Sequence, residues 1–252
     1  MTPCVPPSPD RAAVPPASEE TSPPTGAPRR TLYGRRKGRG LKPAQEAALN
    51  HLLPALRVLL DGAPGRLDPK ALFPFPVADL WLEIGFGGGE HLIAQAKAQP
   101  EIGLIGCEPF LEGVGKLARA IEAETLANIR IHPGDARDAI AALPEGALGR
   151  VFLLFPDPWP KARHHKRRFV APETLDALAR VLRPGAELRV ATDWPDYVRA
   201  ALSHVLRHPA FDWPATGPAD WRTRPGDWPE TRYERKALAA GRRPFYLRFV
   251  RR

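Results

Sequence analysis

Five short apolar segments, each followed by a stretch with helical spacing, constrain the fold of this chain more than any other feature. The apolar segments cover residues 79–84, 102–107, 128–131, 151–155 and 187–191. Runs of Leu, Ile and Val without regular polar alternation are typical of strands buried on both faces. The stretches with helical spacing lie near residues 89–98, 111–126, 135–142, 172–182 and 195–207. This order predicts strand–helix units joined by right-handed crossovers, and therefore an α/β fold with a largely parallel sheet. Residues 245–250 predict a last strand that closes the sheet in the antiparallel direction.

The first 75 residues predict a different organisation. Residues 1–30 hold nine of the 31 prolines and no long apolar block, so we expect a disordered tail. Residues 31–75 predict a basic linker followed by a helix over 44–60 that Pro54 interrupts. The folded domain is then expected over residues 76–252.

Composition excludes several classes of protein. The 37 Lys and Arg exceed the 28 Asp and Glu by nine, which favours polyanionic partners such as nucleic acid. Hydrophobic residues make up 43% of the chain, enough for a buried core, but no run approaches the roughly 20 apolar residues of a membrane-spanning helix. A membrane protein is therefore not expected. The only cysteines are Cys4 and Cys107, which excludes a disulfide framework and makes the reducing cytoplasm the expected compartment.

Two segments concentrate positive charge. The tract from Arg29 to Arg39 holds six basic residues, one tyrosine and no acid, and it fits a segment lying along a phosphate backbone as well as it fits a solvated linker. Residues 222–252 hold ten basic residues against three acids. This second segment predicts a face that binds RNA with a strong dependence on salt.

A glycine-rich turn follows the first predicted strand. The sequence Glu83-Ile84-Gly85-Phe86-Gly87-Gly88-Gly89-Glu90 leads directly into a helix, at the edge of a parallel sheet where nucleotide-like cofactors bind. The dinucleotide fingerprint would need a third glycine at Glu90, where a carboxylate would repel a pyrophosphate, so a Rossmann oxidoreductase is disfavoured. Glu83, two residues before Gly85, suits a cationic group instead. The turn alone also fits a plain strand-to-helix connection.

Two further carboxylates follow the next two predicted strands. Glu108 stands where an acid can accept hydrogen bonds from both hydroxyls of a ribose, and Asp135 could accept one from an adenine amino group. With Glu83, they describe a site for a nucleoside that carries a positive charge and no phosphate. S-adenosylmethionine fits this description.

The fourth predicted strand leads into a loop that proline makes stiff. Pro156, Pro158 and Pro160 fix φ around Asp157, and the basic run from Lys161 to Arg168 follows at once. A solvated face is the plainer interpretation of such a run, but its position beside an acid at a strand end favours a catalytic edge that binds RNA. No metal is expected, because the histidines of the run are flanked by Lys and Arg and no Cys or Asp completes a ligand set.

Four blocks of this sequence resemble those of the tRNA (guanine-N7)-methyltransferases. The blocks are Glu83–Gly89, the Phe-Pro-Asp-Pro-Trp-Pro-Lys stretch of 155–161 with the His-His-Lys-Arg-Arg run of 164–168, Ala191–Trp194 and Thr231–Lys236. The proline-framed block with its basic run is highly specific, whereas many methyltransferases share the glycine turn. The resemblance covers the chain from about residue 80 to the end.

The resemblance implies a Rossmann-like class I methyltransferase fold, with a largely parallel seven-stranded sheet and helices on both faces. It implies S-adenosyl-L-methionine as cofactor, tRNA as partner, and methyl transfer to N7 of a guanine in the variable loop, at position 46. Matching residue by residue, Asp157 is the catalytic residue, and the cofactor-contacting positions are Glu83, Gly85, Gly87, Glu108, Asp135 and Asp157. The substrate-contacting positions are Lys161, Asp193, Thr231, Arg232, Tyr233 and Glu234. A monomer and a homodimer are both compatible with the sequence.

Two alternatives compete with this interpretation. An idle RNA-binding subunit would not need the three cofactor carboxylates, and a methyltransferase for proteins or small molecules would not need the basic segments. Asp193 also has a plain alternative role as the N-cap of the following helix.

Overall fold

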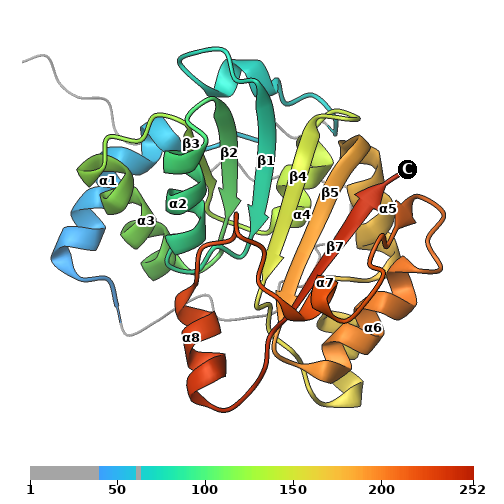
Figure 1. The fold of residues 1–252 in the computed structure, drawn as a ribbon. Helices are drawn as coiled ribbons and strands as arrows, with labels where there is room; N and C mark the ends of the chain where they lie inside the picture. Colours follow the sequence, from blue (N-terminus) through green and yellow to red (C-terminus); the bar gives the residue numbers. More distant parts are fainter. Residues whose placement is uncertain (1–39, 61–63) are drawn as a thin grey trace, which may run out of the picture.

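The computed structural model describes residues 40–60 and 64–252, so the predicted tail and the basic tract Arg29–Arg39 lie outside the described residues. Its strands are β1 (Asp79–Ile84), β2 (Ile102–Cys107), β3 (Ile129–His132), β4 (Leu148–Leu154), β5 (Leu182–Thr192), β6 (Phe211–Asp212) and β7 (Phe245–Arg251). They form one seven-stranded sheet in the order β3-β2-β1-β4-β5-β7-β6 (Figure 1). Strands β1 to β5 are parallel, and β7 runs antiparallel to β5 and β6. The predicted α/β class and the antiparallel last strand are confirmed.

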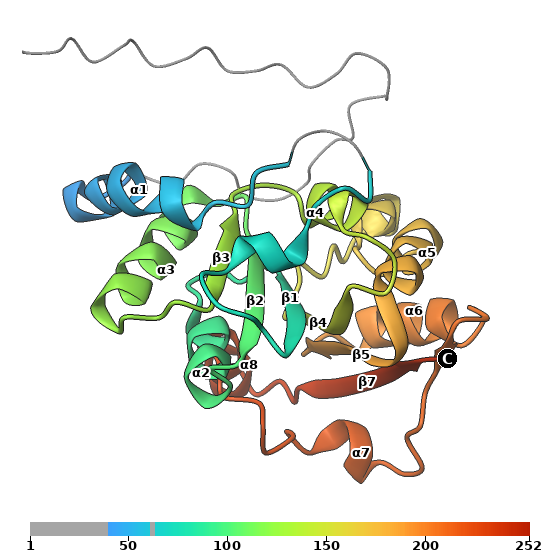
Figure 2. The same cartoon turned by 90° about the horizontal axis from the view of Figure 1, so that it is seen from above.

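Helices cover both faces of the sheet, as Figure 2 shows from above. The α-helices are α1 (Pro43–Leu56), α2 (Glu90–Ala98), α3 (Leu111–Ala123), α4 (Ala136–Ala142), α5 (Pro172–Val181), α6 (Pro195–Val205), α7 (Ala219–Arg222) and α8 (Arg232–Ala239). Two short 3₁₀ helices, η1 (Pro69–Leu72) and η2 (Ala162–Arg167), complete the described elements. Helices α4, α5 and α6 pack into the larger hydrophobic cluster on one face, and α2 and α3 pack into a second cluster on the other.

The central strands are largely apolar because both of their faces are covered. All six residues of β2 are buried, as are five of the six in β1. Burying such side chains contributes roughly 1.5–3 kcal/mol each relative to exposure, which makes the sheet a rigid support for the loops at its edges.

The register of the parallel strands brings their carboxyl ends to one edge of the sheet. Ile84 pairs with Cys107 and Cys107 with His132, while Leu154 pairs with Ala191. The segments that follow these strands therefore start side by side. Glu83 is the second-last residue of β1, and the other predicted acids lie in the segments that follow β2, β3, β4 and β5, namely Glu108, Asp135, Asp157 and Asp193.

The structure differs from the sequence prediction at element boundaries. The helix predicted over 44–60 is α1, which continues through Pro54 and ends at Leu56, because a proline in the last turn removes only one backbone donor. Strand β5 begins at Leu182, earlier than predicted, because Leu182 pairs with Leu148 beyond a register shift between β4 and β5. The predicted boundaries at residues 30 and 75 stay predictions.

Candidate active site

The turn between β1 and α2 is built on three glycines in the left-handed region. Gly85, Gly87 and Gly89 have φ of 72°, 58° and 84°, and residues other than glycine adopt such backbone angles only with strain. The backbone also comes close to a neighbouring helix here, since a Cβ on Gly113 of α3 would overlap the carbonyl oxygen of Gly87. The glycines predicted from the sequence thus form a tight backbone cradle at the strand end.

A buried chain of polar side chains runs behind this cradle. Glu83 Oε2 lies 2.8 Å from His91 Nδ1, and His91 Nε2 lies 3.3 Å from Gln95 Nε2, which also donates to the carbonyl of Asp227 at 2.6 Å. Because the Gln95 amide donates in both contacts, His91 Nε2 accepts and Nδ1 donates its proton to Glu83. Glu83, His91 and Gln95 are 3%, 2% and 4% exposed. These side-chain contacts fix the orientation of the Glu83 carboxylate and connect α2 to the C-terminal segment.

The Glu108 carboxylate is fixed by two backbone donors. Gly87 N donates to Oε2 at 2.8 Å and Phe110 N donates to Oε1 at 2.9 Å. Burial raises the pKa of Glu108, and the nearby negative charges of Asp157 and Glu83 raise it further. Each carboxylate oxygen keeps a free acceptor position, so the side chain can still accept from a pair of hydroxyl groups.

Asp135 has a local role that the sequence did not predict. It is the N-cap of α4, where its Oδ1 accepts from the backbone N–H of Arg137 at 3.0 Å. The guanidinium of Arg137 also pairs with it, with Nε at 3.0 and 2.9 Å from the two carboxylate oxygens. Both oxygens of Asp135 are therefore engaged within its own loop.

The loop after β4 carries Asp157 on a strained backbone. Phe155 and Trp159 have φ of 50° and 44°, in the left-handed region that non-glycine residues rarely adopt. Asp157 lies between them with its side chain at the surface, but the surrounding loop removes part of the water from its carboxyl group and thereby raises its pKa. Buried Arg168 holds this loop in place by donating to the carbonyl of Pro158 at 3.0 Å and pairing with Asp196.

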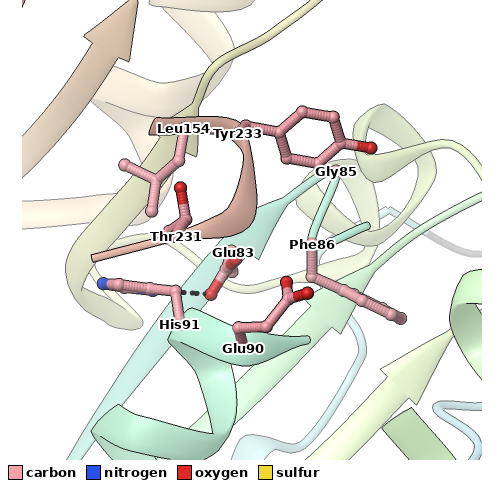
Figure 3. A pocket seen from close by; sticks show the side chains of 8 residues that line it. All are labelled: Glu83, Gly85, Phe86, Glu90, His91, Leu154, Thr231 and Tyr233. Carbon is pink, nitrogen blue, oxygen red and sulfur yellow. Dashed lines mark hydrogen bonds and ion pairs between the residues drawn. The ribbon is translucent and has the colours of Figure 1, made fainter. Parts of the chain in front are cut away.

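The C-terminal segment folds back over the glycine turn. Thr231 caps α8 by accepting from the backbone N–H of Glu234 at 3.2 Å. Tyr233 is 41% exposed and lies against the turn, since a Cβ on Gly87 would sit 3.0 Å from its ring. The side chain of Arg232 stacks over the Tyr233 ring at 5.2 Å. Figure 3 shows Thr231 and Tyr233 on one side of a small pocket, with the Glu83 and Glu90 carboxylates on the other.

The remaining predicted substrate residues lie in different surroundings. Glu234 is buried, accepting from the Tyr246 hydroxyl at 2.5 Å and pairing with Arg224 at 3.1 Å. Lys161 is exposed at the start of η2. Asp193 pairs with Arg242 at 2.5 Å and does not cap α6, whose N-cap is Trp194. The capping alternative for Asp193 is therefore wrong.

The pocket in Figure 3 is lined both by residues that the sequence predicted and by residues that it did not. Glu83, Gly85, Thr231 and Tyr233 were predicted site residues, whereas Phe86, Glu90, His91 and Leu154 line the same pocket without having been assigned a role. Only one sequence signal pointed to the contact between His91 and Glu83. His91 comes eight residues after Glu83, in the helix that follows the turn. Two acids facing one pocket disfavour a phosphate there and favour a positively charged group.

Within residues 40–60 and 64–252, no group of three or more His, Cys, Asp or Glu side chains is arranged to hold a metal ion. Over the same ranges, no helix combines the length and apolar character needed to cross a bilayer.

The sheet order and the acidic glycine turn define the class: this is a Rossmann-like class I methyltransferase fold. A family model described as "Putative methyltransferase" matches residues 78–247. The chain is 58% identical over 223 residues to a tRNA (guanine-N(7)-)-methyltransferase of Rhodospirillum rubrum, with 88% of each chain covered. It is 55% identical over 229 residues to the protein of that name from Ruegeria pomeroyi, covering 89% of this chain and 95% of the relative.

The chain belongs to the tRNA (guanine-N7)-methyltransferase family. Among solved structures, "Crystal Structure of PH0851" matches with a TM-score of 0.51 and 15% identity, over 82% of this chain and 46% of that one. At this identity the likeness concerns the fold alone.

Proposed function

We propose that this protein transfers a methyl group from S-adenosyl-L-methionine to N7 of guanine in tRNA, at position 46 of the variable loop. The observation that carries the proposal is the convergence of acids at one edge of the sheet, around a glycine cradle and beside the proline-framed Asp157. The relatives described above carry the corresponding name. This activity, the expected cytoplasmic location and the RNA partner are mutually consistent.

The residues of the cradle fit the cofactor. The adjacent acids Glu83 and Glu90 suit its cationic end, and Gly85 and Gly87 let the ligand approach the backbone. Glu108 is held by two N–H groups with acceptor positions left for the ribose hydroxyls. Asp135 would reach an adenine amino group only by sharing its oxygens with Arg137.

The chemistry requires alignment more than proton transfer. When bound, S-adenosylmethionine supplies a methyl group already activated on a sulfonium. Guanine N7 is an in-plane acceptor that carries no proton in the neutral base, so the protein needs no general base to create the nucleophile. The site can then act by holding the base in line with the methyl group and by supplying a favourable field.

We assign this work to Asp157, which lies in the loop that follows β4. Its carboxylate accepts from the N1–H and amino group of the guanine, orienting N7, and its negative charge offsets the positive charge that spreads into the base on methylation. The anchor at Arg168 holds the loop in this conformation despite the left-handed backbone of Phe155 and Trp159. A target base that leaves its stack would enter here.

The predicted substrate residues divide into those that border the pocket and those that lie outside it. Thr231 and Tyr233 border the pocket, where the hydroxyl and the ring can contact sugar and base. Lys161, which precedes η2, and Arg232, the first residue of α8, carry the positive charge that phosphate contacts need. Glu234 supports them indirectly, because its buried bonds to Tyr246 and Arg224 hold α8 against the sheet.

One assay tests this proposal. The purified protein is incubated with S-adenosylmethionine carrying a labelled methyl group and with unmodified tRNA, and the product is mapped by strand cleavage at N7-methylguanine. We expect label in tRNA and cleavage at a single variable-loop guanine. Label at another base position, or none in tRNA, would reject the proposal.

A further inference from the structure

A second pocket lies at the same edge of the sheet, beyond the cradle. Its volume is about 310 Å³, the size of small-molecule sites in general. It is lined by Asp193, Trp194, Pro195, Arg222, Arg242, Arg243 and Phe245. We call it the arginine pocket, because three of its residues are arginines and a single acid stands among them.

Arg222 presents a flat surface inside this pocket. Its guanidinium carbon lies 3.9 Å from the centroid of the buried Phe245 ring, so the guanidinium is stacked on the aromatic face. One side of the planar group is then covered by the ring. The other side is available to a second planar group, and nucleic-acid bases stack on arginine in this way.

The other two arginines differ in how far their charge is neutralised. Arg242 pairs with Asp193, which is the pocket's single carboxylate. Exposed Arg243 forms no ion pair with the residues that the structure describes. The pocket therefore holds a net positive charge next to an apolar wall, a combination that suits an anion attached to a planar ring.

The pocket is close to the proposed catalytic loop. Asp193 directly follows β5, and the neighbouring strand β4 leads into the loop that carries Asp157. The two strand ends are joined by the bond from Phe155 N to Ala191 O at 2.7 Å. Figure 1 shows α7, which ends at Arg222, beside β7, whose first residue is Phe245.

We propose that the arginine pocket binds a nucleotide of the RNA substrate next to the target guanine, with the base over Arg222 and the phosphate at Arg243. This inference rests on the proposed function and adds to it a second contact, outside the pocket that holds the cofactor. Such a contact would fix the register of the RNA while the target base turns toward Asp157.

The test measures the affinity of the cofactor-product complex for tRNA. The full chain is saturated with S-adenosylhomocysteine, and fluorescently labelled unmodified tRNA is titrated at two salt concentrations. We expect Arg222→Ala and Arg243→Ala each to raise the Kd for tRNA by about threefold to tenfold, and Arg243→Ala to reduce the salt slope by about one. The matched control is Arg207→Ala, an exposed arginine after α6 at the opposite edge of the sheet, which should leave the Kd unchanged.

Lysine variants separate the two roles. Arg243→Lys should retain most of the affinity because a phosphate needs only a positive charge, whereas Arg222→Lys should bind as weakly as Arg222→Ala because lysine has no plane for stacking. Full affinity in Arg222→Lys would overturn the assignment of the base to Arg222.

The wild-type protein distinguishes failure of the pocket from failure of the proposed function. If wild type methylates N7 of guanine and both arginine-to-alanine variants bind tRNA as tightly as Arg207→Ala, the pocket serves another partner and the inference is wrong. If the wild-type protein does not methylate tRNA at all, the proposed function is wrong, and the inference that rests on it falls with it.

Discussion

The carboxylate of Glu83 is held 2.8 Å from Nδ1 of His91, and both side chains are almost completely buried. Glu83 lies at the end of β1 and His91 in the first turn of α2, so one hydrogen bond spans the glycine turn that forms the cradle. Through Gln95 the same chain of contacts reaches the backbone of Asp227 in the C-terminal segment. The orientation of Glu83 therefore depends on residues far apart in the sequence.

His91→Ala should weaken cofactor binding more than it slows the saturated enzyme. The substitution leaves a buried carboxylate without its donor, which costs about 1–3 kcal/mol, so the Kd for S-adenosylhomocysteine should rise by about fivefold to 100-fold. His91→Asn keeps an N–H donor near the position of Nδ1 and should recover much of the affinity. Calorimetric titration of both variants checks this, and equal weakening by Ala and Asn would show that His91 serves only to fill space.

Asp157→Asn should lower kcat by about 100-fold to 1,000-fold, because an amide of the same shape removes the charge that stabilises the methylated base. Affinity for S-adenosylhomocysteine should change by less than about threefold. Single-turnover methylation of tRNA measures the effect. The control is Asp212→Asn, a half-exposed acid in β6 at the far edge of the sheet, and near-normal turnover in Asp157→Asn would refute the catalytic assignment.

His132 makes the stability of the fold depend on pH. Burial, together with the charge of Arg57, lowers the pKa of His132 to about 4 from 6.5, so the unfolded chain binds a proton between these values that the folded protein does not. Stability is then fully present above about pH 6.5 and is lost as the pH falls toward 4. The loss from this residue amounts to about 2 kcal/mol at pH 5.

Urea unfolding at pH 7 and pH 5 measures this contribution. His132→Gln, which carries no charge at either pH, should lose less stability than wild type over this interval. An identical loss in both proteins would mean that His132 does not titrate as described.

Affinities for RNA and for cofactor should respond differently to salt. Several basic residues of 222–252 are ion-paired within the described part of the protein, but Arg232, Arg235, Lys236 and Arg243 are not, and we expect them to bind phosphates with release of counterions. The affinity for tRNA should then fall by about 100-fold between 50 and 200 mM salt. In the proposed site the cofactor would contact the buried side chains of Glu83 and Glu108, so its affinity should stay nearly constant over that range. Binding isotherms at several salt concentrations check this, and equal salt slopes for both ligands would contradict the division of roles.

The sequence predicted the central sheet well because its strands are buried on both faces and therefore read as continuous apolar runs. The grouping of the acids was also predictable, because the parallel register of β1 and β2 brings Glu83 and Glu108 to one edge of the sheet. Helices α7 and α8 were not predicted, because they are short and largely polar and depend on packing against distant strands.

Contacts between distant segments could not be predicted from the sequence. Gln95 and Asp227 are 132 residues apart, and no local pattern indicates that they touch. The same holds for the Asp193–Arg242 ion pair. The contact between Asp135 and Arg137 is local, but their two-residue spacing gave no sign that the carboxylate would be engaged within its own loop. Sequence patterns locate side chains on elements, whereas their partners follow from the tertiary packing.

The most direct test of the account is a crystal structure of the protein with S-adenosylhomocysteine. We expect the ribose hydroxyls at Glu108, the amino-acid end between the Gly85 turn and Glu83, and the sulfur facing the loop that carries Asp157. A ligand bound away from these carboxylates, with Asp157 out of reach of its sulfur, would contradict the account.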